Sequence, residues 1–294
     1  MLPQEGVWGI LRTLKGLFMT VELFEKIQAY NKSFDKVRIE KALDFVMEKY
    51  HDTEGSITYP LEVLEILLPL RPDEDTIIAV LLHDLYILSF LKDQTVKDLF
   101  GQRVLDLLVG LKRLVHLNFG ENKKNTQVEV LRKMFLTMAK DLRVILIWLA
   151  QRLWRMQNLQ NYPDAGNKLK LAKETMNVYV PIASRLGIYR MKTQLEDLSF
   201  EYLHPLEYET INKQVSKFGE ARKVAIESMQ TRLENFLSQR GIKAEVLGRL
   251  KNVYSIYCKL YKKGLGSAGE LFDLFAMRII LPFEDNVDHL YTVL

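Results

Sequence analysis

The sequence predicts an α+β protein in which an all-helical region, extending to about residue 240, precedes the start of a mixed-sheet α/β domain. Helical periodicity fills the chain before residue 240, and nothing there resembles a strand. The character changes at Gly241, after which AEVLGRL and LFAMRIILPF carry the apolar, β-branched runs of strands around the helical NVYSIYCKLYKKG. This β-α-β beginning needs more strands than the residues up to Leu294 supply, so we expect an incomplete sheet.

The composition indicates an ordinary globular protein. With 294 residues, 48% hydrophobic and 27% charged, the chain can bury a sizeable core and form two domains. No apolar run is long enough for a membrane span, and the first twenty residues lack a signal-peptide pattern, so we expect a cytoplasmic protein without membrane partners. The single cysteine, Cys258, excludes an internal disulfide and a cysteine-based zinc site. A net charge of +4 is too small to argue for direct DNA binding.

The first part of the chain is expected to form helices separated by short polar breaks. Asp75 is the expected N-terminal cap of the apolar helix TIIAVLLHDLYILSFL, and Gly101 and Gly110 are candidate joints within residues 95–116. The other helices predicted before residue 120 cover residues 11–30, 34–50 and 61–70, the last opened by Pro60.

A longer helical tract is predicted for residues 126–159. Its second part, MAKDLRVILIWLAQRLWRM at 138–156, carries apolar residues at steps of three and four on more than one stripe, which indicates a helix buried on most of its circumference. Two helices joined near Gly187 follow within 168–202, and then one polar helix over 206–239. The predicted domains are residues 1–200, a helical connector at 201–240, and an incomplete α/β domain at 241–294.

The adjacent His83 and Asp84 are the most suggestive local pair. An imidazole and a carboxylate on one buried helix can bind a divalent metal that activates water for phosphoester hydrolysis. Two ligands do not make a site, and an isolated pair is more often a hydrogen-bonded core histidine beside a helix-surface acid. Both interpretations stay open at this point.

Several blocks together resemble the RelA/SpoT homologue family, whose bifunctional members make and destroy the alarmone (p)ppGpp. These blocks are LLHDLYIL at 81–88, the central helix at 138–156, ETMNVYVPIASRLGIYRMKTQLEDLSFEYLHPLEY at 174–208, GRLKNVYSIYCKL at 248–260 and LFDLFAMRIIL at 271–281. The resemblance implies an all-helical domain of the HD phosphohydrolase type, a helical connector, and then a nucleotidyltransferase-like α/β pyrophosphokinase domain.

The resemblance also implies that the hydrolase site is vestigial. The family's metal set is an early histidine, the His-Asp pair and an aspartate on the central helix; the pair survives as His83 and Asp84, but Gln151 and Tyr50 replace the other two. An amide at Gln151 removes a negative ligand. We therefore expect no manganese at this site.

Further replacements concern the reacting water and the cations near it. Ile87 and Leu88 stand where active members carry a Glu-Asp that orients the attacking water. Trp154 and Arg155 stand where they carry His-Asn. Apolar residues cannot accept a proton from the water, and Arg155 and the neighbouring Arg152 repel a cation.

The synthetase motif keeps more of its residues. By resemblance, Arg249 and Lys251 bind the donor ATP, and Asp273 binds magnesium. Cations to hold a polyphosphate and carboxylates to hold magnesium are what such a transfer requires. The remaining positions that match nucleotide-binding residues are Ser255, Lys259 and Arg278. Without the resemblance, the simpler interpretation is that these charged residues lie on the solvent-exposed surface of a helix and a strand.

Two departures weaken the synthetase interpretation. The family's Arg-Pro-Lys-His run is here Arg249-Leu250-Lys251-Asn252, so the proline and the histidine are replaced. The second magnesium-binding acid and the tyrosine that stacks on the acceptor base are expected beyond Leu294, as is any domain that contacts the ribosome.

Three functional hypotheses follow. The first is a GTP pyrophosphokinase that transfers pyrophosphate from ATP to the 3′-hydroxyl of GTP or GDP, with magnesium as cofactor and a regulatory, non-hydrolytic helical domain. The second is a manganese-dependent (p)ppGpp hydrolase, which only the His83-Asp84 pair supports. The third is a non-catalytic protein that senses nucleotides or binds a partner.

Overall fold

The computed structural model describes residues 21–52, 57–115, 141–217, 219–264 and 275–281, and the chain divides into two compact units. The first unit comprises residues 1–165 and 177–191, and the second comprises residues 166–176 and 192–294. The predicted order, helices first and then a β-α-β segment, is confirmed in the described residues. None of the described helices has both the length and the apolar character needed to cross a bilayer.

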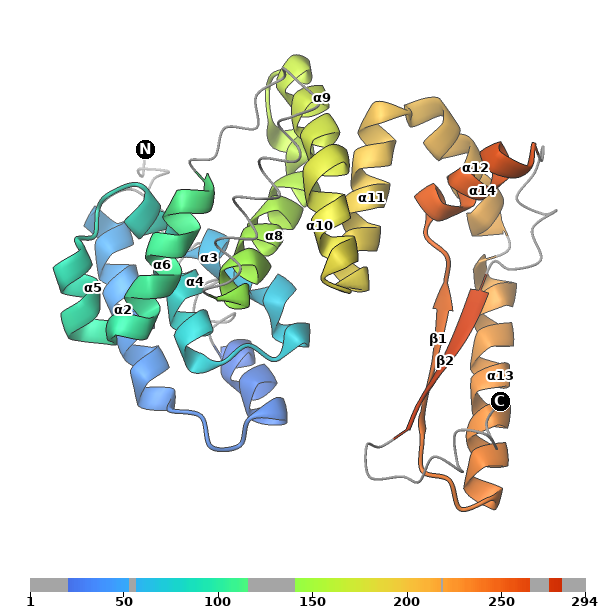
Figure 1. Cartoon of the computed structure of the whole chain (residues 1–294), viewed down its shortest axis with the longest axis horizontal. Helices are drawn as coiled ribbons and strands as arrows, with labels where there is room; N and C mark the ends of the chain where they lie inside the picture. Colours follow the sequence, from blue (N-terminus) through green and yellow to red (C-terminus); the bar gives the residue numbers. More distant parts are fainter. Residues whose placement is uncertain (1–20, 53–56, 116–140, 218, 265–274, 282–294) are drawn as a thin grey trace, which may run out of the picture. The chain divides into compact units, whose positions relative to one another are not determined.

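The first unit is built from helices in its described residues (Figure 1). Residues 21–30 are helical, and the further elements are α2 (Lys36–Asp52), α3 (Thr58–Leu67), α4 (Glu74–Ile87), α5 (Asp93–Phe100), α6 (Gln102–Val115), α8 (Leu142–Gln157) and α10 (Val180–Arg185). Short 3-10 turns extend α3 at Leu68–Leu70 and follow α8 at Leu159–Asn161. The expected helices at 34–50 and 61–70 are therefore confirmed with small shifts of their ends.

The core of this unit forms around α4 and α8. Helix α4 contacts α2, α3, α6 and α8, and every side chain from Ile77 to Leu82 is fully buried. Helix α8 contacts α3, α4 and α6 and is also buried over most of its circumference, as its periodicity predicted. A sequence that is apolar on nearly every side is the signature of such an internal helix.

Two expected helix boundaries in this unit are wrong. The cap of α4 is Asp73, not Asp75: the Asp73 side chain accepts a hydrogen bond from the backbone nitrogen of Thr76, whereas Asp75 lies inside the helix and pairs with Arg38 at 2.6 Å. Gly110 is not a joint but an interior residue of α6. A Cβ atom at Gly110 would lie 3.0 Å from Val144 Cγ2, so the glycine lets α6 approach α8 closely.

The other glycine joints are as expected. Gly101, at φ 93°, separates α5 from α6, and Gly187, at φ 71°, separates α10 from the next helix. The tract predicted as one helix over 126–159 is interrupted, since Asp141 caps the start of α8 with its side chain on the Arg143 nitrogen. The earlier part of that tract, residues 126–140, lies outside the described residues, as do residues 11–20 of the first expected helix.

The second unit combines helices with a two-stranded antiparallel ribbon. Its elements are α9 (Ala165–Glu174), α11 (Tyr189–Leu203, of which 192–203 belong here), α12 (Pro205–Lys217), α13 (Gly219–Gln239), β1 (Glu245–Leu250), α14 (Val253–Lys263) and β2 (Phe275–Ile280). A π-helical turn, Thr175–Tyr179, follows α9. The helix expected over 206–239 corresponds to α12 and α13, and residue 218 between them lies outside the described residues.

Helix α13 covers one face of the ribbon (Figure 1). Leu233 and Leu237 of α13 pack against Val246 of β1 and Met277 of β2, and the Gln230 amide donates to the Val246 carbonyl at 2.7 Å. Gly248 is required at the closest approach, because a Cβ atom there would overlap the Ile226 side chain. Helices α12 and α14 pack together through Ile211, Val215 and Ile256.

Candidate functional site

His83 lies on α4 with its imidazole fully buried. Nδ1 donates to the Val80 carbonyl at 2.5 Å, and Nε2 has no hydrogen-bond partner among the described residues. Burial lowers the pKa of His83, and the nearby Arg155 charge lowers it further, although Val80 and Asp84 act in the opposite direction. The imidazole is therefore neutral near pH 7, with its lone pair on Nε2, the form in which a histidine binds a metal.

Asp84, the next residue, is bonded to a phenol. The Tyr50 hydroxyl of α2 donates to Asp84 Oδ2 at 3.3 Å, so the position aligned with the family's early histidine does lie beside the His-Asp pair. Burial, and then the charge of Asp84, raises the pKa of Tyr50 far above its ordinary value. A protonated phenol donates to the carboxylate and offers a cation no negative charge.

One aromatic side chain packs on the buried imidazole, and a second packs on the first. The Tyr59 ring of α3 packs edge-on against His83 with ring centroids 5.1 Å apart, and the Trp154 ring of α8 packs on Tyr59 at 4.4 Å. Trp154 is fixed by a hydrogen bond from Nε1 to Glu62 Oε2 at 2.8 Å. Sequence reasoning missed Tyr59 altogether, since its role depends on the packing of α3 across α4 and α8 rather than on any motif.

Gln151 and Arg155 lie one helical turn apart on α8, on the same side of the helix. Gln151 is 5% exposed, and its Nε2 has no hydrogen-bond partner within the part of the chain that the structure describes. The Arg155 side chain is exposed to solvent. Its positive charge is nevertheless close enough to Tyr59 and His83 to act to lower the pKa of both. Burial outweighs this effect at Tyr59 and raises its pKa to about 12. The structure thus brings Tyr50, His83, Asp84 and Arg155 into one neighbourhood.

This arrangement does not suit a hydrolytic metal ion. Among the described residues there is no group of three or more histidine, cysteine, aspartate or glutamate side chains that could hold a metal. One imidazole and one carboxylate, the latter shared with Tyr50, leave the cation short of ligands beside a positive charge. Ile87 is half-buried and Leu88 is 58% exposed at the end of α4, and neither supplies an acid for the water.

The expected nucleotide-binding residues follow the ribbon into α14. Arg249 pairs with Ala276 in the ladder and Arg278 pairs with Leu247, so the register places positions 249 and 278 on one face, opposite the face that α13 covers. Lys251 and Asn252 link β1 to α14, and Lys259 lies half-buried on that helix. Asp273, the expected magnesium ligand, lies outside the described residues.

Ser255 and Asn252 are already bonded to protein groups. The Ser255 hydroxyl donates to Asn252 Oδ1, and the Asn252 amide donates to Asp197 Oδ1 at 3.0 Å and to Glu196 Oε2 at 3.2 Å. Burial raises the pKa of Asp197, and hydrogen bonds from Tyr254, Asn252 and Val253 act in the opposite direction. The two acids on α11 were not expected from the sequence, although they lie in the 174–208 block.

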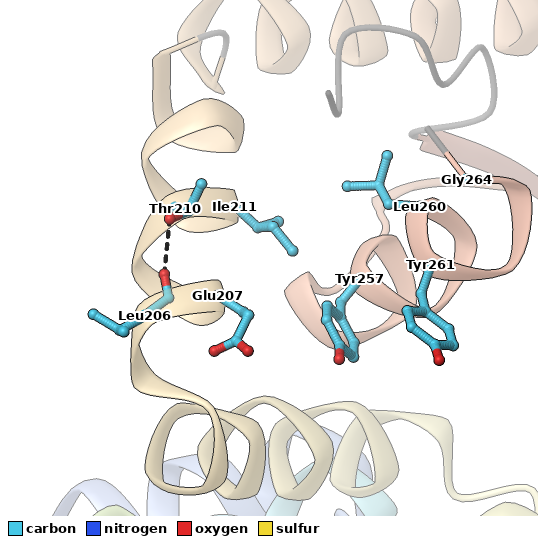
Figure 2. A pocket seen from close by; sticks show the side chains of 8 residues that line it. All are labelled: Leu206, Glu207, Thr210, Ile211, Tyr257, Leu260, Tyr261 and Gly264. Carbon is cyan, nitrogen blue, oxygen red and sulfur yellow. Dashed lines mark hydrogen bonds between the residues drawn. The ribbon is translucent and has the colours of Figure 1, made fainter. Parts of the chain in front are cut away.

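A separate groove of about 650 Å³ lies between α12 and α14 (Figure 2). Figure 2 shows Tyr257 and Tyr261 of α14 facing Glu207 and Ile211 of α12 across it. Its lining is mainly apolar and includes none of the expected nucleotide-binding residues. We therefore place the candidate synthetase site at the β1–α14 junction rather than in this groove.

Comparison with known proteins agrees with both halves of this description. Residues 39–189 match the HD domain family, and residues 248–294 match the region found in RelA / SpoT proteins. The chain belongs to the RelA/SpoT family. The resemblance of the sequence blocks is thereby confirmed, and the helices around His83 are the HD domain of a RelA/SpoT protein.

Several RelA/SpoT relatives are considerably longer than this chain. It is 33% identical over 278 residues to GTP pyrophosphokinase rsh of Brucella melitensis biotype 1, an alignment that covers 93% of this chain and 36% of the relative. It is 38% identical over 234 residues to the bifunctional (p)ppGpp synthase/hydrolase SpoT of Escherichia coli K12, covering 79% of this chain and 33% of the relative. The chain thus spans about a third of the length of these relatives.

Proposed function

We propose that the full-length protein is a (p)ppGpp synthetase that transfers pyrophosphate from ATP to the 3′-hydroxyl of GTP or GDP, and that its HD domain does not hydrolyse the product. The observation that carries this proposal is the contrast between the two sites. The HD domain has a phenol on Asp84 and an amide at Gln151, whereas the β1–α14 segment retains the cationic positions 249, 251 and 259.

The chemistry of the transfer assigns roles to the retained residues. Arg249, Lys251, Lys259 and Arg278 would hold the polyphosphate and base of ATP, and Asp273 would bind the magnesium ion that offsets the charge of the phosphates. Ser255 would act differently from the sequence expectation, since its hydroxyl is bonded to Asn252 and so fixes the helix start rather than a phosphate.

The HD domain would serve as a regulatory module. The relatives are named for both directions of the reaction, GTP pyrophosphokinase in Brucella and (p)ppGpp synthase/hydrolase in Escherichia coli, so family membership alone does not choose between them. The choice rests on residues of this chain, chiefly the loss of negative charge around His83. The donors among the described residues do not fit a hydrolytic metal ion.

One observation favours the alternative, a manganese-dependent hydrolase: the Nε2 lone pair of His83 faces no hydrogen-bond donor among the described residues. A third function, nucleotide sensing without catalysis, is favoured if neither reaction occurs while labelled nucleotide is retained. These outcomes can be separated by two assays on the protein expressed from its whole reading frame.

The first assay supplies ATP, GDP and magnesium and measures ppGpp. We expect synthesis by the wild type, a loss of more than about a hundredfold in Lys251→Gln, and little change in the matched control Lys243→Gln, an exposed lysine just before β1. Absence of ppGpp under these conditions would refute the proposed function. The second assay supplies ppGpp and manganese, for which we expect no release of pyrophosphate.

A further inference from the structure

The start of α14 is held by a carboxylate from another helix. Asp197 of α11 accepts hydrogen bonds from the backbone nitrogens of Tyr254 at 2.8 Å and Val253 at 3.3 Å, the first two residues of α14. Asn252, the N-cap residue by position, makes no side-chain cap bond of its own. The first turn of α14 therefore obtains its capping acceptor from α11, a residue more than fifty positions earlier.

The amide of Asn252 is bonded at both of its polar atoms. Nδ2 donates to Glu196 and Asp197, and Oδ1 accepts from Ser255, so both donors and one acceptor site of the side chain are engaged. Glu196 is 5% exposed and is itself paired with Lys192 at 2.7 Å. Asn252, which stands where the family carries a histidine, thus links the β1–α14 junction to α11.

The electrostatics of this contact reinforce its geometry. A carboxylate at a helix N-terminus interacts favourably with the partial positive charge of the unpaired N–H groups. Hydrogen bonds to a charged group are stronger than those between neutral groups, and Asp197 receives three of them. Asp197 therefore restrains both the first turn of α14 and the residue that follows Lys251.

The other end of the same segment is restrained by a different helix. Gly248 of β1 lies against Ile226 of α13, and Gln230 of α13 binds the Val246 carbonyl. Only Arg249, Leu250 and Lys251 lie between these two anchors. The direction in which Lys251 leaves the ribbon consequently depends on both of them.

We propose that Asp197 is a positioning residue for ATP binding, which holds the β1–α14 junction so that Lys251 and Lys259 present their charges in one arrangement. This inference rests on the proposed synthetase function. Asp197 touches no substrate in this account and acts through Asn252 and the first turn of α14.

The test measures synthesis by the full-length protein with Asp197→Ala, Asp197→Asn and the control Glu201→Gln, an exposed acid on the same helix. We expect the KM for ATP to rise about tenfold in Asp197→Ala, with the KM for GDP changing less than about twofold. Asp197→Asn keeps an acceptor for Tyr254 but turns an amide toward the Val253 N–H, so its rise should be smaller. Glu201→Gln should match the wild type.

Amide hydrogen exchange at Val253 and Tyr254 reports the cap independently of activity. Faster exchange in Asp197→Ala with an unchanged KM for ATP would overturn the inference, as would equal rises in the KM values for ATP and GDP. If the wild type makes no ppGpp, the proposed function fails, and equilibrium dialysis with labelled ATP on the same variants still decides whether Asp197 affects ATP affinity. Should Asp197→Ala fail to fold, the isosteric Asp197→Asn variant supplies the same comparison.

Discussion

At the scale of single residues, the character of the HD site depends on a few side chains around His83. The neutral imidazole and Asp84 are two metal-ligand types in place, but Tyr50 donates a hydrogen bond to that carboxylate and Gln151 contributes no charge. Sequence comparison was enough to find these replacements. It could not find Tyr59, which lies on His83 only because α3 packs across α4 and α8.

Restoring the missing ligands tests this explanation. In the double variant Tyr50→His, Gln151→Asp, the carboxylate of Asp84 is freed and a second imidazole and a second carboxylate are supplied, so manganese affinity should rise by more than about tenfold over the wild type. Titration calorimetry measures it, with Gln160→Asp, an exposed change just beyond α8, as the control for added surface charge. Equal affinities in wild type and double variant would mean that other features, such as the Tyr59 ring, exclude the ion.

At the scale of elements, two helix N-termini of the first unit share one arginine. Arg143 of α8 bonds Asp141, the cap of α8, at 2.6 Å, and also Asp73, the cap of α4, at 2.5 Å. The hydrogen bonds from Arg143 hold the pKa of Asp141 below its usual value. A carboxyl group whose pKa is lowered by folding contributes stability above about pH 4 and loses it as the pH falls through the folded-state value.

Removing this arginine should therefore have a pH-dependent effect. Arg143→Gln should lower the free energy of unfolding by about 1 kcal/mol at pH 7, because the pair is partly exposed, and by less near pH 3. Urea unfolding followed by circular dichroism at both pH values measures the change, and Arg103→Gln, an exposed arginine on α6, is the control. A loss that is the same at both pH values would show that Arg143 acts through packing and not through charge.

The contact between α13 and β1 gives a second prediction at this scale. In Gly248→Ala the new methyl group would overlap Ile226 Cγ2, so we expect the second unit to lose about 1–3 kcal/mol of stability. In an Ile226→Ala background the same substitution should cost clearly less, because the overlapping side chain is gone. If both backgrounds lose the same amount, the overlap with Ile226 is not the cause.

The sequence predicts those elements whose pattern is carried by consecutive residues, and it misses features that depend on contacts between distant segments. Periodicity predicted α8 and the β-α-β order, since these signals are carried by consecutive residues. The cap at Asp73 was missed in favour of Asp75 because both acids precede the same apolar run, and only the structure shows that Asp73 accepts from the Thr76 nitrogen while Asp75 pairs with Arg38. Gly110 was misjudged since its small size serves the approach to Val144, a contact between distant segments.

At the scale of the whole molecule, the proposed function rests on a contrast between the HD domain, where Tyr50 and Gln151 accompany the His-Asp pair, and the cationic positions of the β1–α14 segment. The sequence reached this contrast through family resemblance, whereas the cap that Asp197 provides to α14 emerged only from the structure. Together they predict a protein that synthesises (p)ppGpp and does not hydrolyse it.

The most direct test is the release of pyrophosphate from ppGpp by the purified protein with and without manganese. We expect no release above the protein-free background in either condition, while the Tyr50→His, Gln151→Asp variant serves as the comparison with a restored ligand set. Robust, manganese-stimulated release by the wild type would contradict it.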